Sequence, residues 1–398
     1  MGAPGTAPPR RRGVRRILAA LVGVALSLVL VELACLLAVE GQWLSARVPS
    51  YSVAGSRNTF WGDVSPEFGA WHAPNAAYRH QKACFDVTYR SNSYGARDAE
   101  RPRESDMPRV AVLGDSFMEG YGVEESERLS NVLEQRLAVP FLNFGTSGNA
   151  GSTHAYALYR SLVQGFEHDA VLCAILPEND FDDDQPQQGR YLPYWAGVAP
   201  DFELRFPIPA VSASSWARVE AHAGFDLGAT LRDFTYTQNV VDLLYSAFKQ
   251  QRMRDRIDGD LGPAPSRFHR FSVAEFERLR HSHERIARLA APRQVVLFTI
   301  PRPVDFAVHL ETGRSPLDDA LQAWAATMPN VTFVPLLGEM LRGSSGDPAR
   351  HFLRCDAHWS AAGHRAAAEV LERHLVAALG TAQANSRVTT GARPPESR

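Results

Sequence analysis

The residue best placed to act as a nucleophile is Ser116, in the segment Val112-Leu-Gly-Asp-Ser-Phe-Met-Glu-Gly120. A short apolar strand ends at the glycine-aspartate-serine sequence, so the hydroxyl of Ser116 is expected at the carboxyl end of that strand. The backbone N–H of the same residue then points into the cleft, where it can stabilise an anion. A serine needs a neighbouring base to be nucleophilic at neutral pH. Without one, this sequence is equally typical of a turn.

A histidine that could supply the base lies near the C-terminus, in Cys355-Asp-Ala-His-Trp-Ser360. Ser360 can cap the helix that follows, so His358 is expected in a loop. There it can accept the proton of the serine hydroxyl while Asp356 orients its ring. By itself the segment is more typical of an ordinary loop histidine. His364 falls within the helix and is expected to be structural. No further ligand completes a metal site with these residues, so we expect neither a metal nor a cofactor.

Two loops between these segments contain groups that could donate hydrogen bonds to an oxyanion. The first is Asn143-Phe-Gly-Thr-Ser-Gly-Asn149, where Gly148 lets a backbone N–H approach a ligand oxygen closely. The second is Leu176-Pro-Glu-Asn-Asp180, where Asn179 offers an uncharged side-chain N–H. A glycine in a loop and an asparagine that caps a turn are the ordinary interpretations of these two residues.

The elements that must position these residues alternate between short apolar strands and helices with apolar spacing. The predicted strands are residues 109–114, 140–145, 169–176, 294–300 and 331–336. The predicted helices are residues 127–138, 152–166 with Ser152 as N-cap, 272–291, 317–327 and 360–379. This alternation predicts an α/β domain with a parallel sheet and helices on both faces. The four loops are then expected to converge at one edge of the sheet.

Three further segments flank or interrupt this domain, which we place at residues 109–379. Residues 40–108 contain aromatic residues and turn formers and are expected to pack along it as a lead-in. Residues 181–271 form an insertion, with a possible hairpin at 189–207 and a helical stretch at 226–253. We expect it over the carboxyl edge of the sheet. The polar tail, residues 380–398, is expected to be disordered.

An apolar run of 23 residues, Ile17–Val39, follows a basic tail, residues 1–16. The run is long enough to cross a bilayer as a helix, and the arginines before it favour a cytoplasmic N-terminus and an extracytoplasmic domain. A cleaved signal peptide with its apolar region at 17–31 is the alternative; we favour the uncleaved anchor because no small-residue cleavage site follows. Glu32 would lie near the outer end or pair with another helix. The net charge of −2 gives no reason to expect a nucleic-acid partner.

The chain contains four cysteines. Cys35 lies in the apolar run, and Cys173 lies in a predicted buried strand. The remaining two, Cys84 and Cys355, could form a disulfide in an oxidising compartment, or could be two unrelated thiols.

Taken together, the four loops resemble the four sequence blocks of the SGNH (GDSL-like) hydrolase family, which is named for Ser, Gly, Asn and His. The matches are Gly114-Asp115-Ser116 with Gly120, then Gly148, then Asn179-Asp180, and then Asp356 and His358 with Gly363. The resemblance covers residues 109–379, and Asn92-Ser-Tyr-Gly-Ala-Arg-Asp98 looks like a segment of the membrane-anchored members.

This resemblance implies a flavodoxin-like three-layer α/β/α fold and a metal-free acyl-serine mechanism. Ser116 would be the nucleophile, His358 the base and Asp356 its partner, with the oxyanion held by Ser116, Gly148 and Asn179. The sequence departs from the family at Pro177, where glycine is frequent, and in the spacing Asp-x-His instead of Asp-x-x-His. The first could reshape the oxyanion loop, and the second bears on how Asp356 reaches the imidazole.

The expected function is a serine esterase acting on small O-acyl groups, such as O-acetyl on an envelope carbohydrate. Water would complete hydrolysis, whereas a sugar hydroxyl would complete acyl transfer, and the sequence does not separate the two. The two departures from the family motivate an alternative of another class, a catalytically silent glycan-binding or scaffold protein at the membrane.

Overall fold

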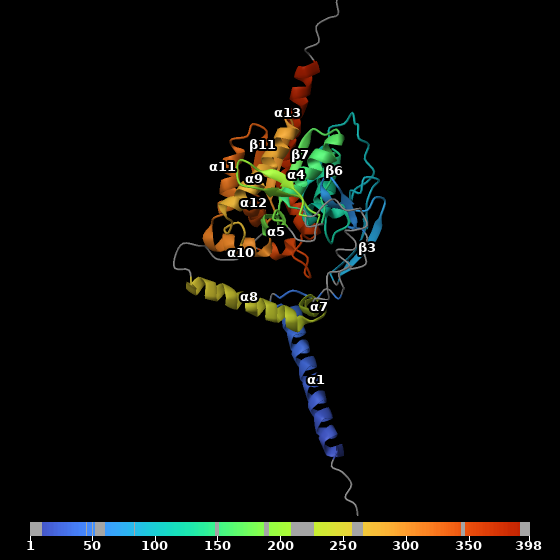
Figure 1. Ribbon diagram of the computed structural model, residues 1–398, viewed down its shortest axis with the longest axis vertical. Helices are drawn as coiled ribbons and strands as arrows, with labels where there is room; N and C mark the ends of the chain where they lie inside the picture. Colours follow the sequence, from blue (N-terminus) through green and yellow to red (C-terminus); the bar gives the residue numbers. More distant parts are fainter. Residues whose placement is uncertain are drawn as a thin grey trace, which may run out of the picture.

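A parallel sheet of five strands lies at the centre of the folded domain (Figure 1). The computed structural model describes residues 10–44, 46–49, 51, 60–82, 84–147, 151–186, 191–207, 227–256, 266–343 and 347–390. The strands are β5 (Val110–Leu113), β6 (Phe141–Asn143), β7 (Ala170–Ile175), β10 (Gln294–Thr299) and β11 (Val331–Val334). Their order across the sheet, β11-β10-β7-β5-β6, is the flavodoxin-like order. All five strands predicted from the sequence are therefore confirmed, each slightly shorter than expected.

Helices cover both faces of the sheet and make a three-layer domain, as predicted. One face packs against α4 (Ser152–Ser161), α9 (Val273–Ala290) and α11 (Pro316–Ala325). The other packs against α3 (Leu129–Leu137), α12 (Leu336–Gly343) and α13 (Ala361–Thr390). Successive strand residues point to opposite faces, so in β7 Cys173 faces the first core and Leu172 the second, and both are fully buried.

The helices differ from the sequence-based expectation in three respects. The structure adds short helices at the carboxyl ends of four strands: α2 (Ser116–Glu119), α5 (Pro177–Asp183), α10 (Pro303–Thr312) and α12. The N-cap of α4 is Gly151, so the prediction of Ser152 as its cap is wrong by one residue. The last helix, α13, continues to Thr390, eleven residues beyond Leu379, so the part of the expected tail up to that residue is helical.

The lead-in segment forms two antiparallel hairpins, β1 (Asp63–Ser65) with β2 (Gly69–Trp71) and β3 (Ala77–Lys82) with β4 (Phe85–Arg90). The second hairpin is joined to the loop before α13 by a disulfide between Cys84 and Cys355, whose Cα atoms are 5.7 Å apart. The pairing considered from the sequence is therefore present, and it places β3 beside the segment that contains His358.

The insertion divides into two parts with different partners. Strands β8 (Tyr194–Ala196) and β9 (Glu203–Arg205) form the expected hairpin, and Trp195 donates a hydrogen bond from its indole to Ser282 of α9. The predicted helical stretch is two helices, α7 (Leu227–Phe234) and α8 (Tyr236–Arg256). These lie against the end of α1, below the carboxyl edge of the sheet in Figure 1. Residues 187–190, which include the first two residues of the predicted hairpin, lie outside the described residues.

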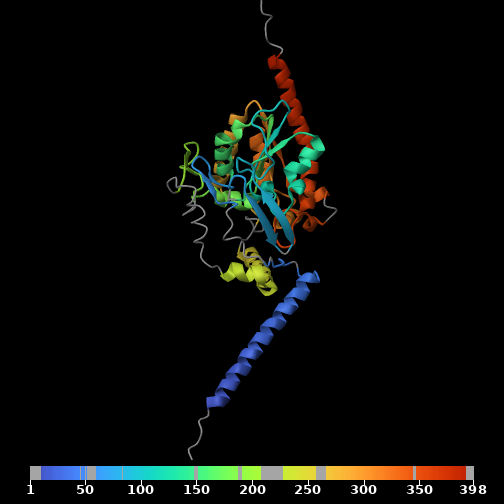
Figure 2. The ribbon, with the colours of Figure 1, turned by 90° about the vertical axis from the view of Figure 1, so that its right-hand side faces the viewer.

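The N-terminal helix α1 (Arg10–Glu40) projects away from the domain (Figures 1 and 2). Its stretch Val14–Glu40 has 27 residues and is long and apolar enough to cross a membrane, although a signal sequence passes the same test. Within the described ranges no other helix meets this criterion.

The last turns of α1 make specific contacts with the rest of the chain. The carboxylate of Glu32 accepts hydrogen bonds from the backbone N–H groups of Tyr236 and Thr237, at 2.6 and 3.0 Å, and from the Thr237 hydroxyl at 2.6 Å. Glu32 thus caps the start of α8, so the partner helix considered from the sequence belongs to this same chain. Val39 is buried against α8, and Glu40 forms an ion pair with Arg354 at 3.1 Å.

Candidate active site

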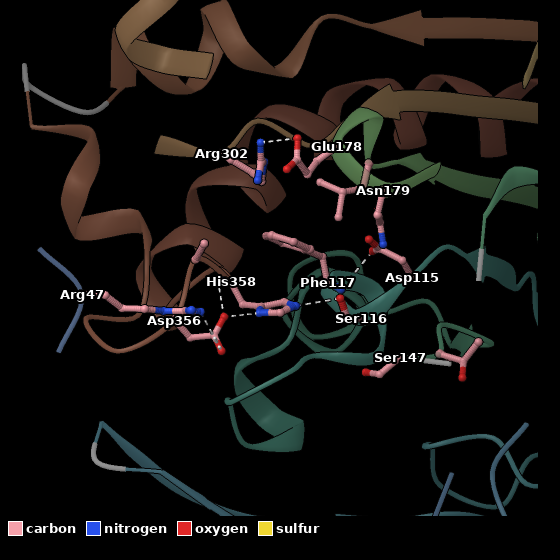
Figure 3. A pocket seen from close by; sticks show the side chains of 13 residues that line it. Arg47, Asp115, Ser116, Phe117, Ser147, Glu178, Asn179, Arg302, Asp356 and His358 are labelled. Atoms are coloured by element: carbon pink, nitrogen blue, oxygen red, sulfur yellow. Dashed lines mark hydrogen bonds and ion pairs between the residues drawn. The ribbon is translucent and has the colours of Figure 1, made fainter. Parts of the chain in front are cut away.

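Three of the predicted catalytic side chains meet at the carboxyl edge of the sheet (Figure 3). The hydroxyl oxygen of Ser116 lies 2.7 Å from Nε2 of His358, and Nδ1 of the same ring lies 2.5 Å from Oδ1 of Asp356. With Asp356 ionised, Nδ1 donates to the carboxylate, which leaves Nε2 to accept the serine proton. The structure therefore brings together, across 242 positions of sequence, a hydroxyl, a base and an orienting carboxylate.

The turn between β5 and α2 fixes the position of Ser116. Ser116 is the first residue of α2, so its backbone N–H has no acceptor within the helix and is available to a ligand. Asp115 caps the helix by accepting a hydrogen bond from the Phe117 N–H at 3.0 Å. Gly114 adopts a φ of +153°, and a Cβ there would lie 2.5 Å from the Met118 side chain. A glycine is needed at this position so that the strand can turn sharply into the helix.

His358 is held by a closed loop and by aromatic neighbours. A β-bridge between Phe352 and Trp359 closes the loop, and the Leu353 N–H donates to the His358 carbonyl at 2.9 Å. The imidazole stacks on the ring of Tyr121 with centroids 4.1 Å apart. Within this loop Asp356 reaches the ring with one intervening residue, so the shortened Asp-x-His spacing does not separate the two side chains.

Asp356 has a second set of partners that the sequence did not reveal. Its Oδ2 accepts a hydrogen bond from Lys82 Nζ at 2.9 Å and lies 3.8 Å from the Arg47 guanidinium. Burial by itself would raise the pKa of Asp356, but the hydrogen bonds and charges of His358 and Lys82 hold that pKa well below its usual range. The Cys84–Cys355 bridge was the signal that could have found Lys82, because it brings the end of β3 next to Asp356.

Of the two predicted oxyanion donors in the second and third loops, the structure describes Asn179 but not Gly148. Asn179 lines the same cavity as Ser116 and His358, and its Oδ1 is buried with no hydrogen-bond partner among the described residues. Gly148 lies outside the described residues. Pro177 is the first residue of α5, a position where the missing N–H of proline costs nothing. Pro177, which stands where glycine is frequent in the family that the sequence resembles, therefore begins a helix that presents Asn179 two residues later.

A buried carboxylate, which the sequence analysis missed, holds the loop that precedes Gly148. Glu119 of α2 is fully buried and accepts hydrogen bonds from the Ser147 hydroxyl and from the Trp61 indole, the latter at 2.9 Å. His72 Nε2 lies 3.4 Å from the same carboxylate. Nothing in the local sequence pairs these residues. The contact ties the second loop of the site to the helix that begins with Ser116.

The cavity around Ser116 has a volume of about 330 Å³. This is at the small end of the range for ligand sites, so it suits a compact group. Arg47 lies on one side of the cavity, and Arg302, paired with Glu178 at 2.5 Å, lies on another (Figure 3). His364 lies outside the cavity lining, in α13, where its Nδ1 accepts a hydrogen bond from the Leu129 N–H at 3.2 Å; this structural role agrees with the prediction.

Three buried carboxyl groups lie behind the nucleophile. Burial, reinforced by the neighbouring carboxylates, raises the pKa of Asp115 and of Asp184 to about 7 and that of Asp180 well above its usual value. Asp184 accepts a hydrogen bond from the Thr153 N–H at 2.7 Å, and Asp180 accepts one from the Ser152 hydroxyl at 3.2 Å. These bonds fasten α5, and with it Asn179, to the start of α4.

The raised pKa values predict that the folded protein loses stability as the pH rises from 6.5 to 8.5. An unfolded aspartate titrates near 3.9, so above that pH the folded state binds more protons than the unfolded state. The free energy of unfolding therefore falls with rising pH until the buried carboxyl groups, with a pKa of about 7, have themselves ionised. Below pH 6.5 the buried histidines, such as His283 with a pKa of about 3, act in the opposite direction. Thermal unfolding is expected to show a fall in Tm on the order of 5 °C across this window.

The variant Asp184→Asn keeps an acceptor for the Thr153 N–H but cannot ionise. Its Tm is expected to fall less between pH 6.5 and 8.5 than that of the unmodified protein. The exposed Asp106, in the segment before β5, provides the matched control, and Asp106→Asn should leave the slope unchanged. A Tm that rises with pH in this window, or an unaltered slope in Asp184→Asn, would contradict the assignment.

No family model and no curated protein matches this sequence. Among solved structures, the chain is similar to a member of the lipolytic protein G-D-S-L family from Veillonella parvula, at 11% identity over 66% of this chain and 95% of that chain, with a TM-score of 0.35. It is similar to the lipase/acylhydrolase from Enterococcus faecalis, at 13% identity over 68% and 95%, with a TM-score of 0.37. It is also similar to a carbohydrate esterase family 2 enzyme from Corynascus thermopiles, at 14% identity over 71% and 69%, with a TM-score of 0.37.

Proposed function

We propose that the protein is a serine esterase or acyltransferase of the SGNH (GDSL-like) family that works through an acyl-serine intermediate. The observation that carries this proposal is the continuous contact from the Ser116 hydroxyl through the His358 imidazole to Asp356, at 2.7 and 2.5 Å, in a cavity of about 330 Å³. A loop histidine without a catalytic role is not expected to contact both a serine at the end of a strand and a buried carboxylate.

In the proposed reaction His358 Nε2 takes the Ser116 proton as the hydroxyl oxygen attacks the ester carbonyl. The Ser116 N–H, the Asn179 side chain and the Gly148 N–H stabilise the oxyanion. The protonated imidazole then gives its proton to the departing alkoxide, which leaves the acyl group on Ser116. A water molecule, or a sugar hydroxyl, next loses its proton to His358 and attacks the acyl-serine, which restores the free hydroxyl.

We further propose that α1 is retained as a membrane anchor and that the domain lies outside the cytoplasm. Cleavage after Glu40 would remove the cap that Glu32 provides to α8 and the ion pair of Glu40 with Arg354, and cleavage between these two residues would remove the cap alone. A disulfide persists in an oxidising compartment, which agrees with an extracytoplasmic domain. The arginines of residues 10–16 then remain on the cytoplasmic side.

The contacts of the catalytic loop with the end of α1 support a substrate of the cell envelope. Arg354 pairs with Glu40, and the Arg47 side chain donates to the Cys355 carbonyl at 3.2 Å. These residues adjoin Asp356, so an anchored protein would keep its cavity near the bilayer surface. Small O-acyl groups, such as O-acetyl on an envelope carbohydrate, are the substrates that this position and the cavity volume favour.

Incubation of the full-length protein with an O-acetylated oligosaccharide tests the proposal. We expect either free acetate or, when an unacetylated glycan is added, an acetylated acceptor, and mass spectrometry of the products distinguishes these. The same preparation should hydrolyse a short-chain nitrophenyl ester. If neither ester is cleaved while the oligosaccharide still binds, the catalytic proposal fails and the silent glycan-binding alternative is supported.

A further inference from the structure

Helix α8 carries an exposed apolar stripe. Val241, Leu244, Tyr245 and Phe248 follow the spacing i, i+3, i+4, i+7, so they lie on one side of the helix. All four are exposed, and Leu244 is 58% accessible. The same helix buries Tyr236 and Val240 against α1 and the segment that follows it. Helix α8 therefore has one apolar side that the chain covers and a second that faces outward.

Helix α7 presents a second exposed apolar stripe next to the first. Leu227, Leu231 and Phe234 are spaced by four and three residues and are all exposed. Helices α7 and α8 are in contact and are joined by Thr235 alone. Together these seven exposed side chains form what we call the apolar shelf.

The position of α8 along α1 places the apolar shelf at the depth of a membrane interface. Fifteen residues separate Ile17 from Glu32, which is about 22 Å of helix at ~1.5 Å per residue. The hydrocarbon core of a bilayer is about 30 Å thick, so Glu32, and the start of α8 that it caps, would lie within ~10 Å of the outer boundary. Helices that lie in the interface bury their apolar side to about this depth.

The direction of α8 agrees with this depth. Figure 1 shows α8 running across the end of α1 instead of alongside it, with the domain on the opposite side from α1. A helix crossing a membrane anchor in this way lies along the bilayer surface.

We propose that α7 and α8 lie in the outer-leaflet interface of the membrane that α1 crosses, with the apolar shelf in contact with lipid acyl chains. This inference rests on the proposed anchored topology and is independent of the esterase activity. Two attachments, α1 and the apolar shelf, then fix the orientation of the domain, because a single helix alone would leave it free to swing. The catalytic loop, tied to Glu40 through Arg354, is held facing the bilayer surface.

Fluorescence quenching on the full-length chain in lipid nanodiscs tests this inference. In a Cys35→Ala background, where the remaining free thiol Cys173 is buried, the variant Leu244→Cys is labelled with bimane. We expect loss of fluorescence with lipids that carry a nitroxide on the acyl chain, and little loss with iodide in the aqueous phase. Leu28→Cys, in the apolar part of α1 and 65% exposed, provides the lipid-facing control. Val376→Cys, on α13 and 54% exposed, provides the aqueous control.

The two controls separate the possible failures. Lipid quenching at Leu28 with iodide quenching at Leu244 would overturn the inference and leave the anchor intact. Protection of Leu244 from both quenchers would also overturn it, because a second copy of the chain or another protein would then cover the apolar shelf. Iodide quenching at Leu28 would overturn the anchored topology and the inference together. Ester hydrolysis, measured separately on the same samples, reports on the catalytic proposal alone.

Discussion

The variant Ser116→Ala is expected to lower kcat for a short-chain nitrophenyl ester by about 10⁴- to 10⁶-fold. The substitution removes the nucleophile and leaves the oxyanion donors. The remaining rate then comes only from stabilisation of the oxyanion and from substrate binding. The fold should be unaffected, because alanine is accommodated at the first position of α2 and the Asp115 cap remains. Rates of ester cleavage and thermal unfolding curves, measured side by side, check both statements.

A fluorophosphonate probe gives an independent readout of the same residue. Mass mapping is expected to find the probe on Ser116 and to find no label in Ser116→Ala. The control is Ser147, whose hydroxyl also lines the cavity but donates to the buried Glu119. Ser147→Ala should still be labelled at Ser116. Equal hydrolysis by the unmodified protein and Ser116→Ala would refute the assigned nucleophile.

The second large effect is expected for Asp356→Asn, which should lower kcat by about 10⁴-fold. The carboxylate of Asp356 accepts a hydrogen bond from Nδ1 of His358. The amide N–H of an asparagine can instead donate to Nδ1, which stabilises the His358 tautomer that carries its proton on Nε2. That tautomer cannot accept the Ser116 proton. Ester hydrolysis under substrate saturation measures the loss, and KM is expected to change little because Asp356 contacts the imidazole instead of the reacting ester.

Lys82→Met provides a graded comparison for this variant. Lys82 contacts Oδ2 of Asp356, on the side away from His358, so its loss should loosen the carboxylate without removing the bond to Nδ1. We expect a fall in kcat of about tenfold, which corresponds to ~1.4 kcal/mol.

The exposed Asp86 of β4 is the matched control for Asp356→Asn, and the kcat of Asp86→Asn should be nearly unchanged. Comparable activity in Asp356→Asn and Asp86→Asn would show that the ring is oriented without Asp356.

The sheet and the meeting of the three predicted catalytic side chains could be anticipated from the sequence because their signals are local. Each strand is a short apolar run, and each site residue follows such a run or precedes a helix. Parallel strands then bring their carboxyl ends to one edge, so Ser116 and His358 are expected to meet although they are 242 positions apart. The short helices α2 and α5 escaped prediction, because one or two turns of helix leave no clear periodicity in the sequence.

The supporting contacts could not be predicted, because they depend on pairs of distant residues without a shared pattern. Lys82 and Asp356 are 274 positions apart, and Glu32 and Tyr236 are 204 apart. A lysine at a strand end and a glutamate in an apolar helix each have many possible partners. The fold selects the partner. The disulfide brings Lys82 to Asp356, and the packing of α8 on α1 brings Glu32 to Tyr236.

The disulfide between Cys84 and Cys355 also changes the covalent connectivity of the domain. All five strands of the central sheet lie between these two residues, so the polypeptide around the sheet is a closed ring. A single proteolytic nick inside that ring opens it but does not divide it. A nick that leaves Ser116 on one fragment and His358 on the other would therefore keep both fragments covalently joined until a reductant breaks the sulfur–sulfur bond.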